Sequence, residues 1–286
     1  MTAVILHMLR RSTGAILGWG LSLALLGFYL MQFYDTLADQ RAMIEQLISQ
    51  YPPELMAFFG GGENAFSPQG YLSMEFFSII PVVIGIYAIL SGCSLLLGDE
   101  EAGILDLLLA HPISRSRFFL GRVAAIATAL AVILGIVWIA FIGGVAVSEE
   151  LNLSALELLR PFIALFALLF LFQSLSLFLS MILPSRSMAA LVSGLLLVGS
   201  YFINALAGFD ETVKKVSAYL PMKYYQSGYA VDGLNSDWLL RLFGAGLFFV
   251  ALTWALFLRR DIRVSGEGSW RLPAWPRLRV QGRKST

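Results

Sequence analysis

The chain has 286 residues, of which 58% are hydrophobic and 14% are charged, and its formal net charge is +1. A soluble domain is about half apolar and a quarter charged, so this composition excludes an ordinary soluble protein and indicates one that lies in a bilayer. The balanced charge gives no reason to expect a nucleic-acid partner. One cysteine and two histidines exclude an intrachain disulfide and a metal site built from clustered cysteines or histidines.

Six apolar stretches are each long enough to cross a bilayer as a helix, which takes about 20 residues. They are 13–34, 76–97, 118–147, 161–183, 188–209 and 239–258. Helix is the expected form because unpaired backbone groups are costly in lipid. We therefore predict an all-α integral membrane protein, with a six-helix transmembrane domain over residues 1–258 and a basic cytoplasmic tail over residues 259–286.

The placement of lysine and arginine favours a cytoplasmic N-terminus, because basic residues concentrate on the cytoplasmic side of membrane proteins. With that orientation, fourteen of the 20 basic residues fall in inside segments and six fall outside. Six spans then bring the C-terminus back to the cytoplasm as well. We predict a multi-pass protein with both termini inside.

The last outer connection, 210–238, is rich in tyrosine. The tyrosines are Tyr219, Tyr224, Tyr225 and Tyr229. Because such rings favour the membrane interface, we expect short helices in this connection that dip toward the bilayer without crossing it.

The most informative stretch is the first inner loop, 98–117, between the second and third spans. Acids at 99–101 precede an apolar stretch that Pro112 ends, and negative charge of this kind favours a helix N-terminus. The apolar side chains of this short helix would be Ile104, Leu105, Leu108 and Leu109. One interpretation is that the helix lies flat in the interface or packs under the bundle. The other is that it docks into a groove on a cytoplasmic partner, as amphipathic helices do.

The same loop resembles the first cytoplasmic loop of ABC-2 type transporter permeases. That family's pattern runs acid-x-Gly-Thr-Leu-Glu-x-Leu-Leu, then Pro-[Val/Ile]-Ser-Arg, then Gly-[Lys/Arg] at the third span. Here the pattern begins at Glu101 and ends at Arg122. Ile104 stands where threonine is common, and Asp106 where glutamate is common.

The resemblance implies a type V exporter-like permease in a prokaryotic cell membrane. Two permease chains, expected to be a homodimer, would form the pathway, and two copies of a cytoplasmic ABC ATPase would drive alternating access. The coupling residues would be Glu100, Glu101, Gly103, Ile104, Leu105, Asp106, Leu108, Leu109, His111, Pro112, Ser114 and Arg115. The sequence contains no phosphate-binding loop of its own. We therefore expect ATP and Mg on the partner and no cofactor on this chain.

Polar residues in or beside the spans are candidates for the substrate pathway. They are Glu75, Gln32, Gln173, Ser176 and Asn204. Each also has a plainer interpretation, because an acid at a span end commonly faces water and amides commonly join helices. Gly14 with Gly18, and Ala190 with Gly194, are spaced for close helix approach, either within the bundle or at a dimer seam.

The resemblance implies export. The apolar spans and scarce charges suggest a small or amphipathic substrate, as in a multidrug exporter. The alternatives are a membrane-embedded enzyme and a non-transporting membrane scaffold. The enzyme is disfavoured because the sequence has no Gly-x-Ser-x-Gly and no histidine in any predicted span. We expect no catalytic residue and no metal site in this chain.

Overall fold

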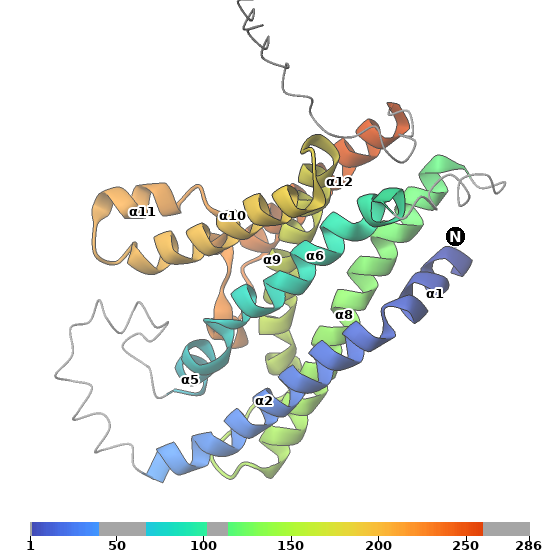
Figure 1. Ribbon diagram of the computed structural model, residues 1–286. Coiled ribbons are helices and arrows are strands. Elements are labelled where there is room, and N and C mark those ends of the chain that lie inside the picture. The colour runs from blue at the N-terminus through green and yellow to red at the C-terminus, as the bar shows by residue number, and fades with distance from the viewer. Residues whose placement is uncertain (1, 40–66, 102–113, 260–286) are drawn as a thin grey trace, which may run out of the picture.

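The computed structural model describes residues 2–39, 67–101 and 114–259, and every element within these ranges is helical. Six helices are long and apolar enough to cross a membrane (Figure 1). They are α2 (Thr13–Asp39), α6 (Ile80–Glu101), α8 (Arg115–Val147), α9 (Ala155–Ile182), α10 (Arg186–Leu206) and α12 (Ser236–Arg259). The predicted all-α fold with six membrane-crossing helices is therefore confirmed for the described residues. The tail after Arg259 lies outside them.

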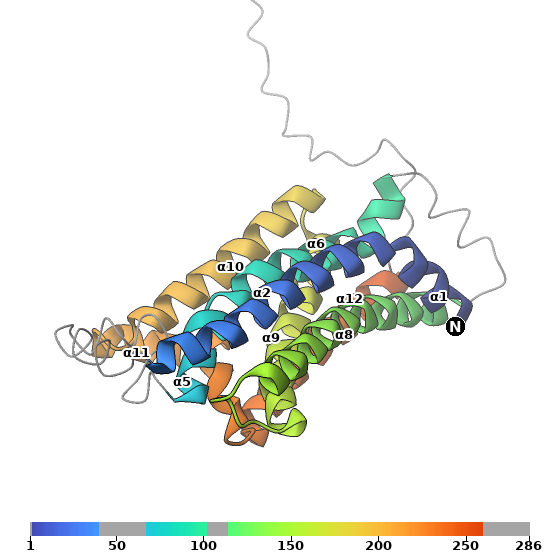
Figure 2. The same ribbon diagram turned by 90° about the horizontal axis from the view of Figure 1, so that it is seen from below.

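The shorter elements lie at the two ends of the bundle. They are α1 (Thr2–Arg11), α5 (Pro68–Leu72), the π-helical η1 (Ser73–Phe77), α11 (Glu211–Ser217), and the 3₁₀ turns η2 (Pro221–Tyr224) and η3 (Ser227–Val231). Helix α1 lies at the same end as the end of α6, the start of α8 and the end of α12, which we name the α1 end (Figure 2). The opposite end, with α5 and α11, is named the distal end.

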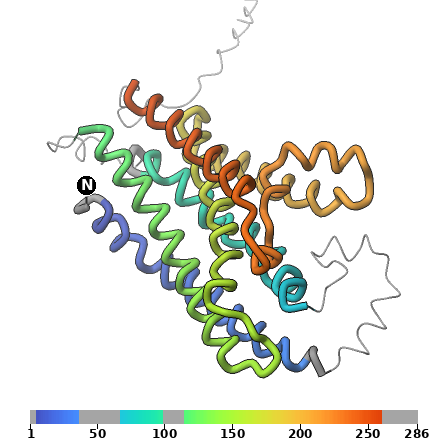
Figure 3. Tube along the Cα trace, turned by 180° about the vertical axis from the view of Figure 1, so that it is seen from behind, coloured from blue at the N-terminus to red at the C-terminus, as the bar shows by residue number. Residues whose placement is uncertain are grey.

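Helix α9 is the centre of the bundle. Both α6 and α12 pack along it, while α2 packs along α8. Helix α10 lies at the side, against α6 and α9, and continues into α11 as an arm that projects from the bundle (Figure 3). Among the six spans, α9 is therefore the most buried by protein, and α10 and α12 are the least buried.

Four buried phenylalanines pack together in the distal half of the bundle. Phe76 and Phe77 come from η1, Phe141 from α8 and Phe162 from α9, and neighbouring rings meet edge to face with centroids 4.8–5.2 Å apart. Such pairs each contribute about 0.5–1.5 kcal/mol beyond the area they bury. Gly27 lets α2 approach this group, because a Cβ there would lie 2.1 Å from the Phe141 ring.

The start of α9 is set by a capping box. The Ser154 hydroxyl accepts the Glu157 N–H at 3.3 Å, and the Glu157 carboxylate accepts the Ser154 N–H at 2.8 Å. The two contacts satisfy donors that a helix leaves open at its first turn. The helix therefore begins at Ala155, ahead of the apolar stretch predicted from residue 161, which starts only after Arg160.

The connection between α10 and α12 forms the short helices α11, η2 and η3. It turns back along α10, because the Ser217 hydroxyl bonds the Asn204 side chain at 2.9 Å and the Met222 N–H donates to the Ser200 hydroxyl at 3.1 Å. Ser200 lies six residues before the end of α10, which is about 9 Å along a helix. The connection therefore contains the short helices that were expected, and their dip toward the bilayer stays a prediction.

Candidate functional site

The predicted coupling segment is framed by two helix ends. Helix α6 runs to Glu101 and α8 begins at Arg115, so both ends face the same side of the bundle. Glu100 and Glu101 belong to the last turn of α6. The other predicted coupling residues before Ser114 lie outside the described residues: Gly103, Ile104, Leu105, Asp106, Leu108, Leu109, His111 and Pro112.

Ser114 begins α8. Its hydroxyl accepts the Arg117 N–H at 3.4 Å, and its backbone is extended while Arg115 is already helical. A serine in this position satisfies one of the open N–H groups at a helix start. The exit from the 102–113 segment is therefore fixed by a cap, with Arg115 exposed in the first turn.

The helix ends around this segment form one packed unit. Phe119 of α8 stacks on Phe257 of α12 at 5.6 Å, and the buried Arg122 guanidinium lies 5.1 Å from the centre of the Phe118 ring. The Trp254 indole donates to the Ser116 hydroxyl at 3.2 Å. Leu95 and Leu96 bring the end of α6 into the same apolar cluster. The two helix ends that flank residues 102–113 therefore pack with α12 in one apolar cluster.

Of the predicted pathway residues, Gln173 and Ser176 lie together in the interior. The Gln173 amide nitrogen donates to the Ser91 hydroxyl at 2.9 Å and to the Ile126 carbonyl at 3.4 Å. The Ser176 hydroxyl donates to the backbone carbonyl of Gln173 at 2.9 Å. The two Gln173 bonds join α9 to α6 and α8, which matches the role of a polar contact between helices, whereas the Ser176 bond stays within α9.

The remaining pathway candidates lie apart from this pair. The Gln32 amide donates to the Gly144 carbonyl at 3.1 Å and joins α2 to α8. The Asn204 carbonyl oxygen accepts from the Ser217 hydroxyl and joins α10 to α11. Glu75 is exposed on η1. The structure thus places the five candidates in several different surroundings and does not assemble them into a single polar site.

Most of the chain matches a known protein family. Residues 9–262 match the family described as ABC-2 family transporter protein. The chain belongs to this family. No individual curated protein matches it. As an ABC-2 permease, the chain is a multi-pass transport subunit that works with an ABC ATPase.

Several polar side chains that hold the distal end of the permease were not singled out from the sequence. The Asp35 carboxylate at the end of α2 accepts the Ser148 hydroxyl and, at 3.2 Å and 3.4 Å, the N–H groups of Glu149 and Glu150. It thereby fixes the α8–α9 turn. The only signal available in the sequence was an acid just beyond an apolar run, which is also typical of an ordinary solvated residue.

Two buried tyrosines tie the distal end of the permease to backbone carbonyls. The Tyr71 hydroxyl donates to the Leu30 carbonyl at 2.6 Å, and the Tyr225 hydroxyl donates to the Phe77 carbonyl at 3.1 Å. Burial raises the pKa of Tyr71 and that of Tyr225, so both hydroxyls keep their protons and remain donors. Within the described ranges, no three of the histidine, cysteine, aspartate and glutamate side chains gather as a metal site would require.

Proposed function

We propose that this permease is the membrane half of an ATP-driven exporter. Two copies, as a homodimer, would form the translocation pathway, and two ATPase subunits would bind the 102–113 segment from the cytoplasm. ATP and Mg would be held on those subunits and not on this chain. The protein would lie in a prokaryotic cell membrane with both termini inside.

The observation that carries this proposal is the frame around the 102–113 segment. A family-like motif of acid, glycine and leucines occupies the short interval between Glu101 and Arg115, whose helices end on the same side. Because α6 and α8 also share the cluster of Phe119 and Phe257 with α12, a partner that pushes on the segment would move several spans. This is the mechanical connection that an external ATPase needs.

Uncovered small residues support the dimer. A Cβ added at Gly14, Gly18 or Gly194 would meet nothing within 4 Å in the single chain. These three positions therefore do not bring helices close together within the single chain. A second permease chain against one of these surfaces is consistent with them, because small residues let helices approach closely.

The substrate class is proposed as small or amphipathic compounds. The Gln173 amide bonds to neighbouring helices and the Ser176 hydroxyl bonds within its own helix, and the other side chains of the described interior are mainly apolar. An apolar or amphipathic compound, including many drugs, fits such surroundings better than a strongly charged one.

Leu108→Asp tests the proposal. A carboxylate in the apolar face of the coupling segment should abolish co-purification of the ATPase and reduce coupled ATP hydrolysis at least tenfold, because the docking contact is apolar. The matched control is Leu156→Asp, at an exposed position in the first turn of α9 at the distal end. That variant should keep both properties. If Leu108→Asp retains ATPase binding and wild-type ATP turnover, the proposal is wrong.

A further inference from the structure

Exposed arginines lie on three helix ends that come together at the α1 end of the bundle (Figure 2). They are Arg10 and Arg11 at the end of α1, Arg115 and Arg117 at the start of α8, and Arg259 at the end of α12. Among the side chains that the structure describes, the ion pair lies in α11, at the distal end. No described carboxylate therefore pairs with Arg10, Arg117 or Arg259.

The three helix ends pack on one another, so their arginines are held on a common support. Helix α1 packs along α8, and Met8 of α1 contacts the apolar cluster that contains Phe119 and Phe257. The Trp254 indole of α12 donates to the Ser116 hydroxyl of α8 at 3.2 Å. The positive charges of the three helices therefore form one surface, which we name the arginine surface and define by Arg10, Arg117 and Arg259.

The arginine surface lies at the edge of the apolar spans. Arg10 shortly precedes the span in α2, Arg117 directly precedes the apolar run of α8, and Arg259 is the last residue of the span in α12. In a bilayer, the edge of a span lies at the level of the lipid headgroups, because the hydrocarbon core ends there. The three guanidinium groups are therefore placed at the depth of the phosphates.

Exposed apolar side chains lie next to two of these arginines, on the side toward the middle of the span. On α8, Leu120 is 41% exposed and shares a helix face with Arg117 at a spacing of three residues. On α12, Leu256 is 38% exposed and has the same spacing from Arg259. Positive charge followed by apolar surface is the order in which a phospholipid carries its phosphate and its acyl chains.

We infer that the ends of α1, α8 and α12 form a binding site for an anionic phospholipid. The guanidinium groups of the arginine surface donate to the phosphate, which arginine can bind through two N–H groups at once. The acyl chains lie over Leu120 and Leu256. Basic surfaces between membrane helices attract anionic headgroups, and each arginine near the bilayer surface adds to this attraction. The site goes beyond the proposed function, and binding at it does not require the ATPase.

The test is a lipid titration of the detergent-solubilised permease followed by native mass spectrometry. The wild type should bind dioleoyl phosphatidylglycerol at least tenfold more tightly than dioleoyl phosphatidylcholine, because the choline ammonium cancels the phosphate charge. The variant that combines Arg10→Gln, Arg117→Gln and Arg259→Gln should bind phosphatidylglycerol at least tenfold more weakly than the wild type. Its binding of phosphatidylcholine should be unchanged. An arginine variant that keeps the wild-type preference refutes the site.

The matched control combines Lys214→Gln, Lys215→Gln and Lys223→Gln, which removes the same charge from exposed side chains at the distal end. This variant should keep the preference for phosphatidylglycerol within twofold of the wild type. An equal loss in the two variants would show that net charge, and not the arginine surface, selects the lipid. Because all six side chains are exposed, both variants should also keep the wild-type unfolding midpoint.

Two further measurements separate the lipid from other anionic ligands. Excess inorganic phosphate should not displace phosphatidylglycerol from the wild type, since it cannot use the apolar part of the site. Displacement would assign the surface to a free anion and refute the lipid site. Co-purification of the ATPase should be the same with the arginine variant as with the wild type. Loss of the ATPase with unchanged lipid binding would instead make the arginine surface a contact of the partner protein.

Discussion

Helices α9 and α10 are neighbours in the chain and both qualify as membrane spans, but their surroundings differ. Both are strongly apolar, but 72% of the most apolar part of α9 and only 22% of that of α10 are buried by protein. The apolarity of a helix therefore shows that it can cross lipid, but it does not show whether protein or lipid covers the helix. Both helices bury polar side chains, such as Gln173 on α9 and Ser193 on α10. The difference lies in the apolar ones, because α10 exposes leucines such as Leu191 and Leu195.

The largest expected effect comes from breaking the close contact of α9 with α6. A Cβ at Gly92 would lie 2.2 Å from the Ser176 hydroxyl and 2.3 Å from the Gln173 carbonyl, which is backbone and cannot rotate away. Gly92→Ala should therefore force the helices apart and cost about 1–3 kcal/mol, the usual range for overpacking. Thermal unfolding of the detergent-solubilised permease, followed by tryptophan fluorescence, measures the loss.

The matched control for Gly92→Ala is Gly199→Ala on α10, where an added Cβ meets nothing within 4 Å. Its unfolding midpoint should be unchanged or slightly raised, since alanine favours helix over glycine. Equal midpoints for the two alanine variants would show that α9 and α10 are packed alike in the assembled protein, contrary to the comparison.

Gln173→Leu also weakens the contact of α9 with its neighbours, and it should lower the free energy of unfolding by a smaller amount. It removes the bonds to Ser91 and Ile126 and should cost about 1 kcal/mol, as buried polar contacts between membrane helices do. The loss is limited because the side-chain amide oxygen of Gln173, Oε1, has no hydrogen-bond partner among the described residues. Unfolding by SDS titration measures it.

Asn204→Leu on α10 is the counterpart, since it removes one bond to Ser217 at the end of the span. We expect a change of only a few tenths of a kcal/mol in the free energy of unfolding. A larger loss for Asn204→Leu than for Gln173→Leu would reverse the ranking of the two helices.

The sequence predicted the spans because each depends on a local property, an apolar run of sufficient length. It also placed the first inner loop, 98–117, between the second and third spans. The structure extends α6 to Glu101 and begins α8 at Arg115, so each helix runs a few residues into that predicted loop. The neighbours of each span were not predictable, since hydropathy is the same toward protein and toward lipid. Gln173 was a candidate for either substrate or helix contact, and only the positions of Ser91 and Ile126 show which bonds it makes.

The contact between η3 and the α5–η1 run at the distal end was even harder to predict from the sequence. Gln69, Ser73 and Ser227 are ordinary residue types for a loop, and their significance comes from pairing over more than 150 positions. No local pattern marks such a pair. The short helices of the 210–238 connection were expected from its tyrosines, but their contact with α5 and η1 depends on the whole bundle.

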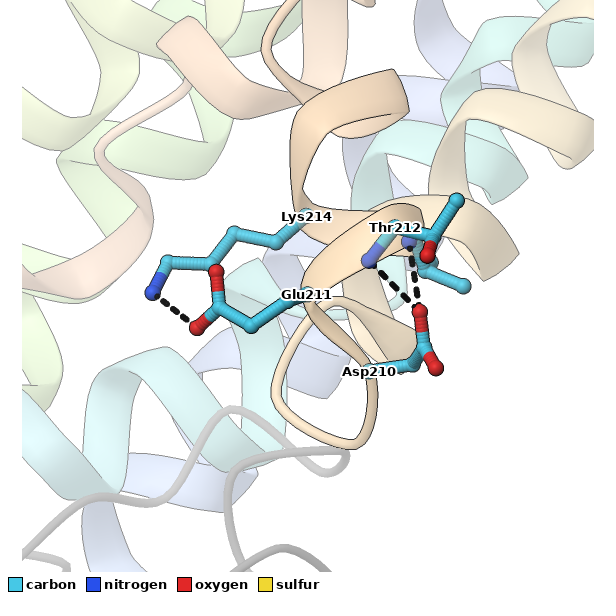
Figure 4. A network of polar contacts seen from close by, with 5 residues as sticks. Asp210, Glu211, Thr212 and Lys214 are labelled. Atoms are coloured by element: carbon cyan, nitrogen blue, oxygen red, sulfur yellow. Dashed lines mark hydrogen bonds and ion pairs between the residues drawn. The ribbon is translucent and has the colours of Figure 1, made fainter.

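The smallest effect is expected in the arm formed by α10 and α11, at Asp210. Its carboxylate accepts the N–H groups of Thr212 and Val213 at 2.6 Å and 3.1 Å and begins α11, beside the Glu211–Lys214 ion pair of 2.9 Å (Figure 4). These backbone hydrogen bonds hold the pKa of Asp210 below its ordinary value of 3.8. A lowered pKa means that the folded arm favours the charged form. The cap is therefore complete above pH 3.8 and is lost as the pH falls through the lowered value.

A spin label at Tyr219→Cys, in the Cys93→Ala background, reports on this arm because Tyr219 is 89% exposed. Between pH 7 and pH 4 the label should stay restricted with Asp210, and it should loosen only at lower pH. With Asp210→Ala it should be mobile throughout, while Asp210→Asn should keep it restricted at every pH, because asparagine caps without titrating. The unfolding midpoint of the bundle should not move in either variant, since α11 packs mainly on the exposed span α10. A restricted label in Asp210→Ala would instead mean that another chain, such as the second permease, holds the arm.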